Sequence, residues 1–140
     1  MSADDAPVIA TSVGAAGEDW FNQARITAYG ATGTAVDEEG PAVNQADCSS
    51  LSYALYDVTA DMSVINPSTA LTVASQISNS LTDDDVWTLD TTGRNFLHNI
   101  AGSLLTKHNH RYRAVYTLTL TGGAIKKWAH ERTILDLTSP

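Results

Sequence analysis

The stretch 111–121, RYRAVYTLTLT, decides the fold class. Its larger apolar side chains recur at every second position, at Tyr112, Ala114, Tyr116, Leu118 and Leu120. Because successive side chains of a β-strand point to opposite faces, this period of two predicts a strand with one buried face. Gly122-Gly123 follows directly, and glycine tolerates the positive φ of a tight hairpin. Residues 124–137 are then the returning strand, and the pair is antiparallel because only antiparallel neighbours are joined so briefly.

Further stretches show strand patterns. Residues 22–29 (NQARITAY) and 50–58 (SLSYALYDV) alternate, and weaker patterns occur at 87–93 and at 96–105. Residues 68–81 fit a strand that passes into a helical turn, and Asn66-Pro67 is a breaker that ends whatever precedes it. About seven short strands with at most one helix predict an all-β, immunoglobulin-like antiparallel β-sandwich.

The length of 140 residues fits a single domain. Residues 1–19 are rich in Ala, Gly, Asp and Ser and show no periodicity, which predicts a flexible N-terminal arm of the kind that orders on a partner. Residues 20–140 contain no linker and are expected to form one β-sandwich domain.

The charge is unevenly distributed along the chain. The net charge is −8, which argues against nucleic acid as a partner because phosphate binding relies on clustered Lys and Arg. Residues 1–100 hold 14 acids and two bases (−12), whereas residues 101–140 hold six bases and two acids (+4). If the C-terminal strands share a face, that face would attract the acidic part of another copy. The alternative is that the uneven distribution arises by chance from the composition and that the charged side chains only form a solvated surface.

The sequence gives no sign of export or of a membrane anchor. The first residues carry Asp4 and Asp5 where a signal peptide would carry Lys or Arg, and no apolar run approaches the length of a membrane span. Cys48 is the single cysteine, so an internal disulfide is excluded and an ordinary thiol is expected. We therefore expect a protein made in the cytoplasm, with no membrane partner.

Metal binding is a possible reading of two segments. His108 and His110 lie two residues apart, and His98 and His130 come near them if the sheet folds suitably, which fits zinc or nickel; the alternative is a polar loop. His130-Glu131 begins a zinc-protease pattern, but Ile134 stands where its second histidine belongs.

The acidic run Asp83-Asp84-Asp85, with Asp90, offers carboxylates to calcium. The spacing departs from the EF-hand, since Thr88 and Arg94 stand at the Gly and Glu positions, so an exposed turn is the alternative. The chain has no nucleophile elbow and no phosphate-binding glycine loop. We expect no catalytic residue, no cofactor and no enzymatic activity.

The aromatic residues suggest an interface. Trp87 lies in an alternating stretch and is expected in the core. Trp20 and Phe21 follow the predicted arm, and Trp128 stands beside Lys126 and Lys127, so these five residues are the predicted interface: Trp20, Phe21, Lys126, Lys127 and Trp128. The alternative is that the two tryptophans cap the ends of the sandwich.

A looser pattern covers about half the chain. It comprises Leu71-Thr-Val-Ala74, Ile77, Leu81, Trp87, Asp90, Gly93-Arg-Asn-Phe96, Tyr112-Arg-Ala-Val-Tyr116 and Gly122-Gly123. This pattern resembles small immunoglobulin-like proteins of tailed phages and of phage-like gene clusters, and the N-terminal domain of phage upper baseplate proteins. The resemblance implies a non-catalytic structural component of a virion or tail-like particle and transfers no site residues, because it consists of core and turn positions.

The expected function is therefore that of a structural subunit that docks on other protein subunits, including copies of itself. The alternative is a carbohydrate-binding or cell-surface-binding module, because β-sandwiches display loops on which Trp and Tyr stack against sugars. Its candidate residues are Tyr29, Trp87 and Trp128. A metal-dependent enzyme using His108 and His110 is the third class.

Overall fold

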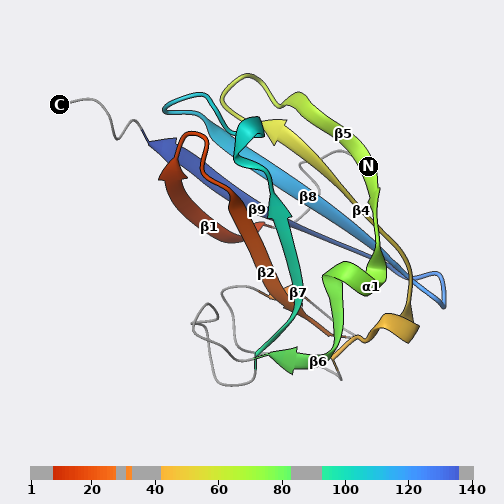
Figure 1. Ribbon diagram of the computed structural model, residues 1–140. Coiled ribbons are helices and arrows are strands. Elements are labelled where there is room, and N and C mark those ends of the chain that lie inside the picture. Colours follow the sequence, from red (N-terminus) through yellow and green to blue (C-terminus); the bar gives the residue numbers. More distant parts are fainter. Residues whose placement is uncertain (1–7, 28–30, 33–41, 83–92, 136–140) are drawn as a thin grey trace.

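The computed structural model describes residues 8–27, 31–32, 42–82 and 93–135. Over these ranges the chain is mainly β, with two sheets packed on each other in a sandwich-like arrangement (Figure 1). The predicted mainly β class is confirmed. Helical structure within the described ranges is limited to the four-residue helix α1 (Val73–Gln76) and to 3-10 turns at Gln45–Asp47 and Gly102–Leu104.

The larger sheet has the strand order β1-β9-β8-β4-β5. The strands are β1 (Val8–Ala15), β9 (Ile125–Leu135), β8 (Arg111–Leu120), β4 (Cys48–Asp57) and β5 (Ser63–Leu71). β1 runs parallel to β9, and the other neighbours are antiparallel. This sheet is therefore mixed, which corrects the prediction of purely antiparallel sheets.

The smaller sheet is antiparallel and has the order β3-β2-β7-β6. Its strands are β3 (Ala31–Thr32), β2 (Trp20–Ile26), β7 (Arg94–Ile100) and β6 (Ile77–Thr82). β3 is only two residues long and pairs with the end of β2, at Arg25 and Ile26. The rest of β2 has its outer edge unpaired within the described residues.

The β8–β9 hairpin forms as predicted. Its register runs from Arg111 opposite Thr133 to Thr119 opposite Ile125, and Gly123 in the turn has a φ of 95°. The inward positions of β8 are buried from Tyr112 to Leu118, as the period of two requires.

The stretch around Asn66-Pro67 differs from the prediction. Both residues lie inside β5, so they do not end a strand. Pro67 has no N–H to donate, but β5 is an edge strand, and its register with β4 shifts between Tyr53 and Leu55, where it passes Pro67. The predicted passage from a strand into a helical turn is confirmed, since β5 leads to α1.

The predicted arm of residues 1–19 needs correction over residues 8–19, while residues 1–7 lie outside the described residues. Residues 8–15 form β1, which pairs along its length with β9, and residues 16–19 turn the chain into β2 of the other sheet. Residues 8–15 belong to the sandwich because their backbone groups form hydrogen bonds with the backbone of β9. The side-chain pattern of the sequence does not predict such bonds.

The core lies between the two sheets and is centred on aromatic rings. Tyr116 stacks on Trp128 with ring centroids 5.5 Å apart, and Phe96 meets both rings edge to face. At the start of β8, the buried Tyr112 accepts a hydrogen bond at its Oη from the backbone N–H of Lys107 (3.2 Å). This bond ties the β7–β8 connection to the core.

Several predicted features fall outside the described residues: Trp87 and its strand apart from Gly93, Tyr29, and the acidic run 83–85 with Asp90. Among the described helices, none has the length and apolar character that a membrane crossing requires.

Candidate functional site

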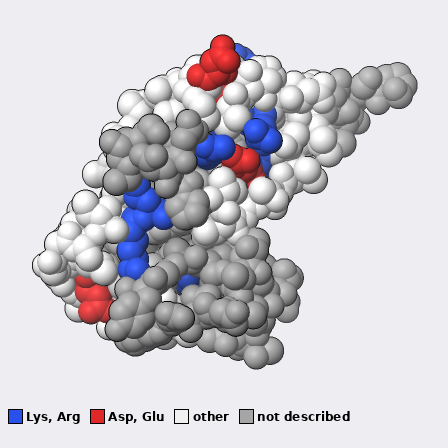
Figure 2. All heavy atoms as spheres, turned by 180° about the vertical axis from the view of Figure 1, so that it is seen from behind, with Lys and Arg blue, Asp and Glu red and all other residues white. Residues whose placement is uncertain are grey.

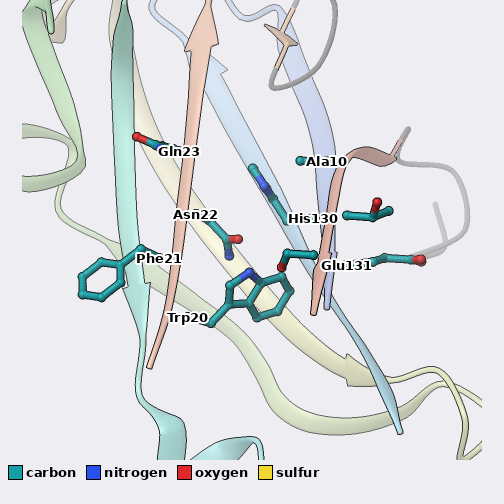
Figure 3. Close-up of a pocket in the computed structure, with 9 residues that line it drawn as sticks. Ala10, Trp20, Phe21, Asn22, Gln23, His130 and Glu131 are labelled. Atoms are coloured by element: carbon teal, nitrogen blue, oxygen red, sulfur yellow. The ribbon is translucent and has the colours of Figure 1, made fainter. Parts of the chain in front are cut away.

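A cavity of about 90 Å³ opens between β1 and β2, one strand from each sheet. Trp20, Asn22 and His130 point into the space between these strands (Figure 3). Ala10 and Ser12 line it from the β1 side. The cavity thus lies where the two sheets meet at an open side of the sandwich.

Below the cavity, three polar side chains from three strands form a buried chain of hydrogen bonds. Asn22 Nδ2 donates to the Tyr116 hydroxyl (2.9 Å), and that hydroxyl lies 2.8 Å from Nδ1 of His98. A hydroxyl that accepts from an amide has its proton free to donate, so Nδ1 of His98 accepts and its ring proton lies on Nε2. The network holds β2, β7 and β8 together through the core.

Burial keeps these groups neutral. Removal from water lowers the pKa of His98 to about 4 and that of His130 to about 3, the latter with a smaller contribution from His98. Burial also raises the pKa of the Tyr116 phenol, against the opposing effect of the Asn22 hydrogen bond. At neutral pH the histidines carry no charge and are weak bases, so the arrangement suits structural hydrogen bonding better than proton transfer.

His130 has a buried ring nitrogen without a hydrogen-bond partner among the described residues. It is 3% exposed and contacts Phe96 and Tyr116 through its ring, but its Nε2 has no hydrogen-bond partner within the described part of the chain. A buried ring nitrogen without a partner favours the entry of water, and the adjoining cavity has room for it.

The outward face of the larger sheet carries charge. Arg113 Nε donates to Glu131 Oε2 (2.5 Å), and Arg111 Nε lies 3.5 Å from the other carboxylate oxygen. Lys127 shares this face with Glu131 because it is four positions away on β9. Figure 2 shows Lys and Arg side chains in an interrupted band across one face of the molecule, with an acidic side chain between two of them.

The predicted interface residues lie in different environments. Phe21 is 57% exposed, and Lys126 and Lys127 are partly exposed on β9. Trp20 (2% exposed) and Trp128 (0%) are buried in the core, so the expectation that they are surface anchors is corrected. In each strand, buried residues lie an even number of positions from the tryptophan, so the tryptophan ring points to the same face, toward the core. Trp128 does not cap an end of the sandwich, because its ring stacks on Tyr116 in the core.

Burial of Trp128 also removes it from the sugar-stacking candidates, since a stacking ring must be exposed. The other two candidates, Tyr29 and Trp87, lie outside the described residues.

The two histidines of residues 108–110 lie in different environments. His110 Nδ1 lies 2.7 Å from Oδ2 of the buried Asp57, whereas His108 is exposed. Across the described ranges, no three His, Cys, Asp or Glu side chains gather as metal ligands would. The calcium candidates lie outside these ranges.

Cys48 is half-buried and donates to the backbone carbonyl of Asn44 (Sγ to O, 3.3 Å). Burial raises the pKa of its thiol, and the neighbouring Asp47 adds to the effect. This fits the expected ordinary thiol, since nucleophilic cysteines have lowered pKa values.

The prediction missed the Asn22–Tyr116–His98 network as a unit. Strand parity contains the signal, because Asn22 alternates with Ala24 and His98 with Phe96, all on inward positions. A polar residue on the apolar face of a strand predicts a buried hydrogen-bond partner.

We find no match to this chain among protein-family models, curated proteins or solved structures.

Proposed function

We propose that the chain is a non-enzymatic structural subunit that assembles with other protein subunits, including its own copies, in a phage virion or tail-like particle. The observation that carries the proposal is the band of basic side chains over β8 and β9 of an otherwise acidic protein (Figure 2).

Charge complementarity supports contacts between copies. Lys107, Arg111, Arg113, Lys126, Lys127 and Arg132 all come from residues 101–140, whose net charge is +4, while residues 1–100 carry −12. Lys126 and Lys127 form no ion pair within the described residues. A basic C-terminal part and an acidic remainder on one molecule favour head-to-tail contacts.

Exposed apolar side chains supply a second kind of contact. Phe21, Val13 and Val64 are each more than half exposed, and the last two lie on the edge strands β1 and β5. Edge strands present unpaired backbone groups, which another chain can use to extend the sheet.

The particle assignment rests on the resemblance of the sequence to phage proteins, and an immunoglobulin-like sandwich is the fold that this resemblance implies. Two features support this type. The strand order β9-β8-β4-β5 opposite β2-β7-β6 matches the order G-F-C-C′ opposite B-E-D of variable-type immunoglobulin domains. The Tyr112–Lys107 bond also resembles the tyrosine corner of that fold, at the start of its strand F. With the pattern in the sequence, these features favour the phage structural class.

Sedimentation velocity over a wide range of protein and salt concentrations tests self-assembly. We expect larger species at high protein concentration that dissociate as salt rises, because salt screens contacts between charged faces. Reversal of two lysines, Lys126→Glu with Lys127→Glu, should weaken the assembly, and Lys126→Arg with Lys127→Arg, which keeps both charges, is the control. A protein that stays monomeric in every condition would contradict the self-assembly part of the proposal.

The particle assignment needs its own measurement. Mass spectrometry of phage or tail-like particles purified from the organism that encodes this chain should find the protein at a fixed copy number per particle. Its consistent absence from such particles would overturn the assignment, whatever the behaviour of the isolated protein.

A further inference from the structure

We propose that β1 is an exchangeable strand, which leaves the edge of its own sheet and pairs in parallel with β9 of a second copy. The inference rests on the proposed assembly role and makes that role specific by naming the segment that crosses between copies.

The first observation is that β1 has no buried side chain. All eight of its residues are partly or fully exposed, and Val13 is 61% exposed. The apolar contact of the strand with the core is limited to the partly buried Ile9, and backbone hydrogen bonds to β9 hold its remaining length. β5 also lacks buried residues, but a short antiparallel hairpin joins it to β4, its direct predecessor in the chain.

The second observation is the cavity beneath β1. Ala10 and Ser12 of β1 face Trp20, Asn22 and His130 across about 90 Å³ of space (Figure 3). The Nε2 atom of His130 has no hydrogen-bond partner among the described residues, which favours the entry of water into this cavity. Few apolar contacts and backbone hydrogen bonds close to water are the features of segments that open locally.

The side-chain contacts of β1 centre on one residue. Arg132 of β9 donates to Ser12 Oγ (3.2 Å) and to Glu18 Oε1 (2.6 Å), and its guanidinium covers Gly14. The Glu18 side chain is 56% exposed, so solvent screens its pairing with Arg132. Release of β1 from β9 therefore breaks only a few side-chain hydrogen bonds, those that Arg132 makes with Ser12 and Glu18.

The connection after β1 supplies the hinge. Residues 16–19 form a short turn in which Gly17 has a φ of 82° and Glu18 N donates to Ala15 O (3.2 Å). Short turns favour strand exchange because straightening them lets the segment reach a neighbour. In a second copy β1 regains the same bonds to β9 and Arg132, so the closed and exchanged forms differ mainly in the hinge and in the entropy of association.

Single cysteines on the two paired strands test this directly. Val13 lies opposite Thr133 in the β1–β9 register, so Val13→Cys on one chain meets Thr133→Cys on another only if β1 has crossed. Both carry Cys48→Ser to remove the natural thiol. Equal amounts are mixed, either folded or unfolded together and refolded, then oxidised at high concentration.

The control for random collision pairs Val13→Cys with Val64→Cys, which lies on the opposite edge strand and is 57% exposed. We expect a several-fold excess of the Val13–Thr133 heterodimer over this control. A single chain with Cys at both 13 and 133, dilute, should close an internal disulfide, which verifies that the substitutions are tolerated.

An excess no greater than the collision control overturns the exchange. Sedimentation of the wild type then separates the two ideas. If the wild type assembles but the Val13–Thr133 heterodimer shows no excess, the copies associate through their charged surfaces and β1 remains paired with β9 of its own chain. If it neither assembles nor crosslinks, the proposed self-assembly fails as well.

Discussion

The hydroxyl of Tyr116 lies 2.8 Å from Nδ1 of His98 and joins a strand of the larger sheet to a strand of the smaller one. The same hydroxyl accepts from Asn22, so one oxygen satisfies two buried polar groups. Polar groups at the centre of an aromatic core fix the relative position of the two sheets, because each would be left without a partner if they slid.

Tyr116→Phe should destabilise the fold by roughly 1–3 kcal/mol, because it leaves Asn22 and His98 buried without their partner. The measurement is the free energy of unfolding from urea titration. Tyr56→Phe is the matched control, since the Tyr56 hydroxyl forms no hydrogen bond within the described residues and its loss should cost little. Equal effects of the two substitutions would contradict the role given to the network.

Stability should fall as the pH drops from about 7 to about 5. The pKa of His130 is about 3 and that of His98 about 4 in the folded protein, against a usual 6.5. Below 6.5 the unfolded chain takes up protons that the folded one does not, so each histidine should cost about 2 kcal/mol by pH 5. His130→Leu should remove about half of this pH dependence. A flat pH profile would show that both rings are solvated.

Gly102→Ala should be strongly destabilising. A Cβ at this position would overlap the backbone carbonyl of Gly17, which cannot move aside without opening the β1–β2 turn. Overpacking of this kind costs roughly 1–3 kcal/mol. Gly122→Ala is the control, because nothing lies within 4 Å of the added methyl group. Thermal unfolding should separate the two variants; similar melting temperatures would mean that the turn adjusts freely.

Substitution of Trp20 by Ala should lower the stability of the fold, whereas substitution of the adjacent Phe21 by Ala should weaken assembly. Trp20→Ala empties a buried site and should cost roughly 3–5 kcal/mol of stability. Phe21→Ala removes a mostly exposed ring, so stability should change by less than about 1 kcal/mol while assembly weakens. The checks are urea titration and sedimentation velocity. A Phe21 variant that assembles like the wild type would exclude this ring from the interface.

The sequence predicts the local part of the fold well. The β8–β9 hairpin and β4 follow from side-chain alternation and a glycine turn, which are properties of neighbouring residues. β1 escapes prediction because its sequence, VIATSVGA, lacks an amphipathic stripe and its partner β9 comes from the other end of the domain. Pro67 inside β5 is tolerated only because that strand is at an edge, which no local pattern reveals.

The site is less predictable than the fold. Trp128 stands between Lys127 and Ala129, and those neighbours suggested a surface position, although its parity with Ile134 places it inside. The network of Asn22, Tyr116 and His98 depends on three strands meeting, and the sequence alone does not determine their order. Burial of single residues follows from alternation, while the pairing of polar groups requires the topology.

The parallel pairing of β1 with β9 also bears on how the protein is made. Ser12 and Arg132, which are bonded in the folded protein, are 120 positions apart. At roughly 5–20 residues per second, a ribosome needs on the order of ten seconds to make β9 after β1 has emerged. Throughout that interval the first strand has no partner within its own nascent chain, because β9, the strand that it pairs with, is the last of the described strands to be made.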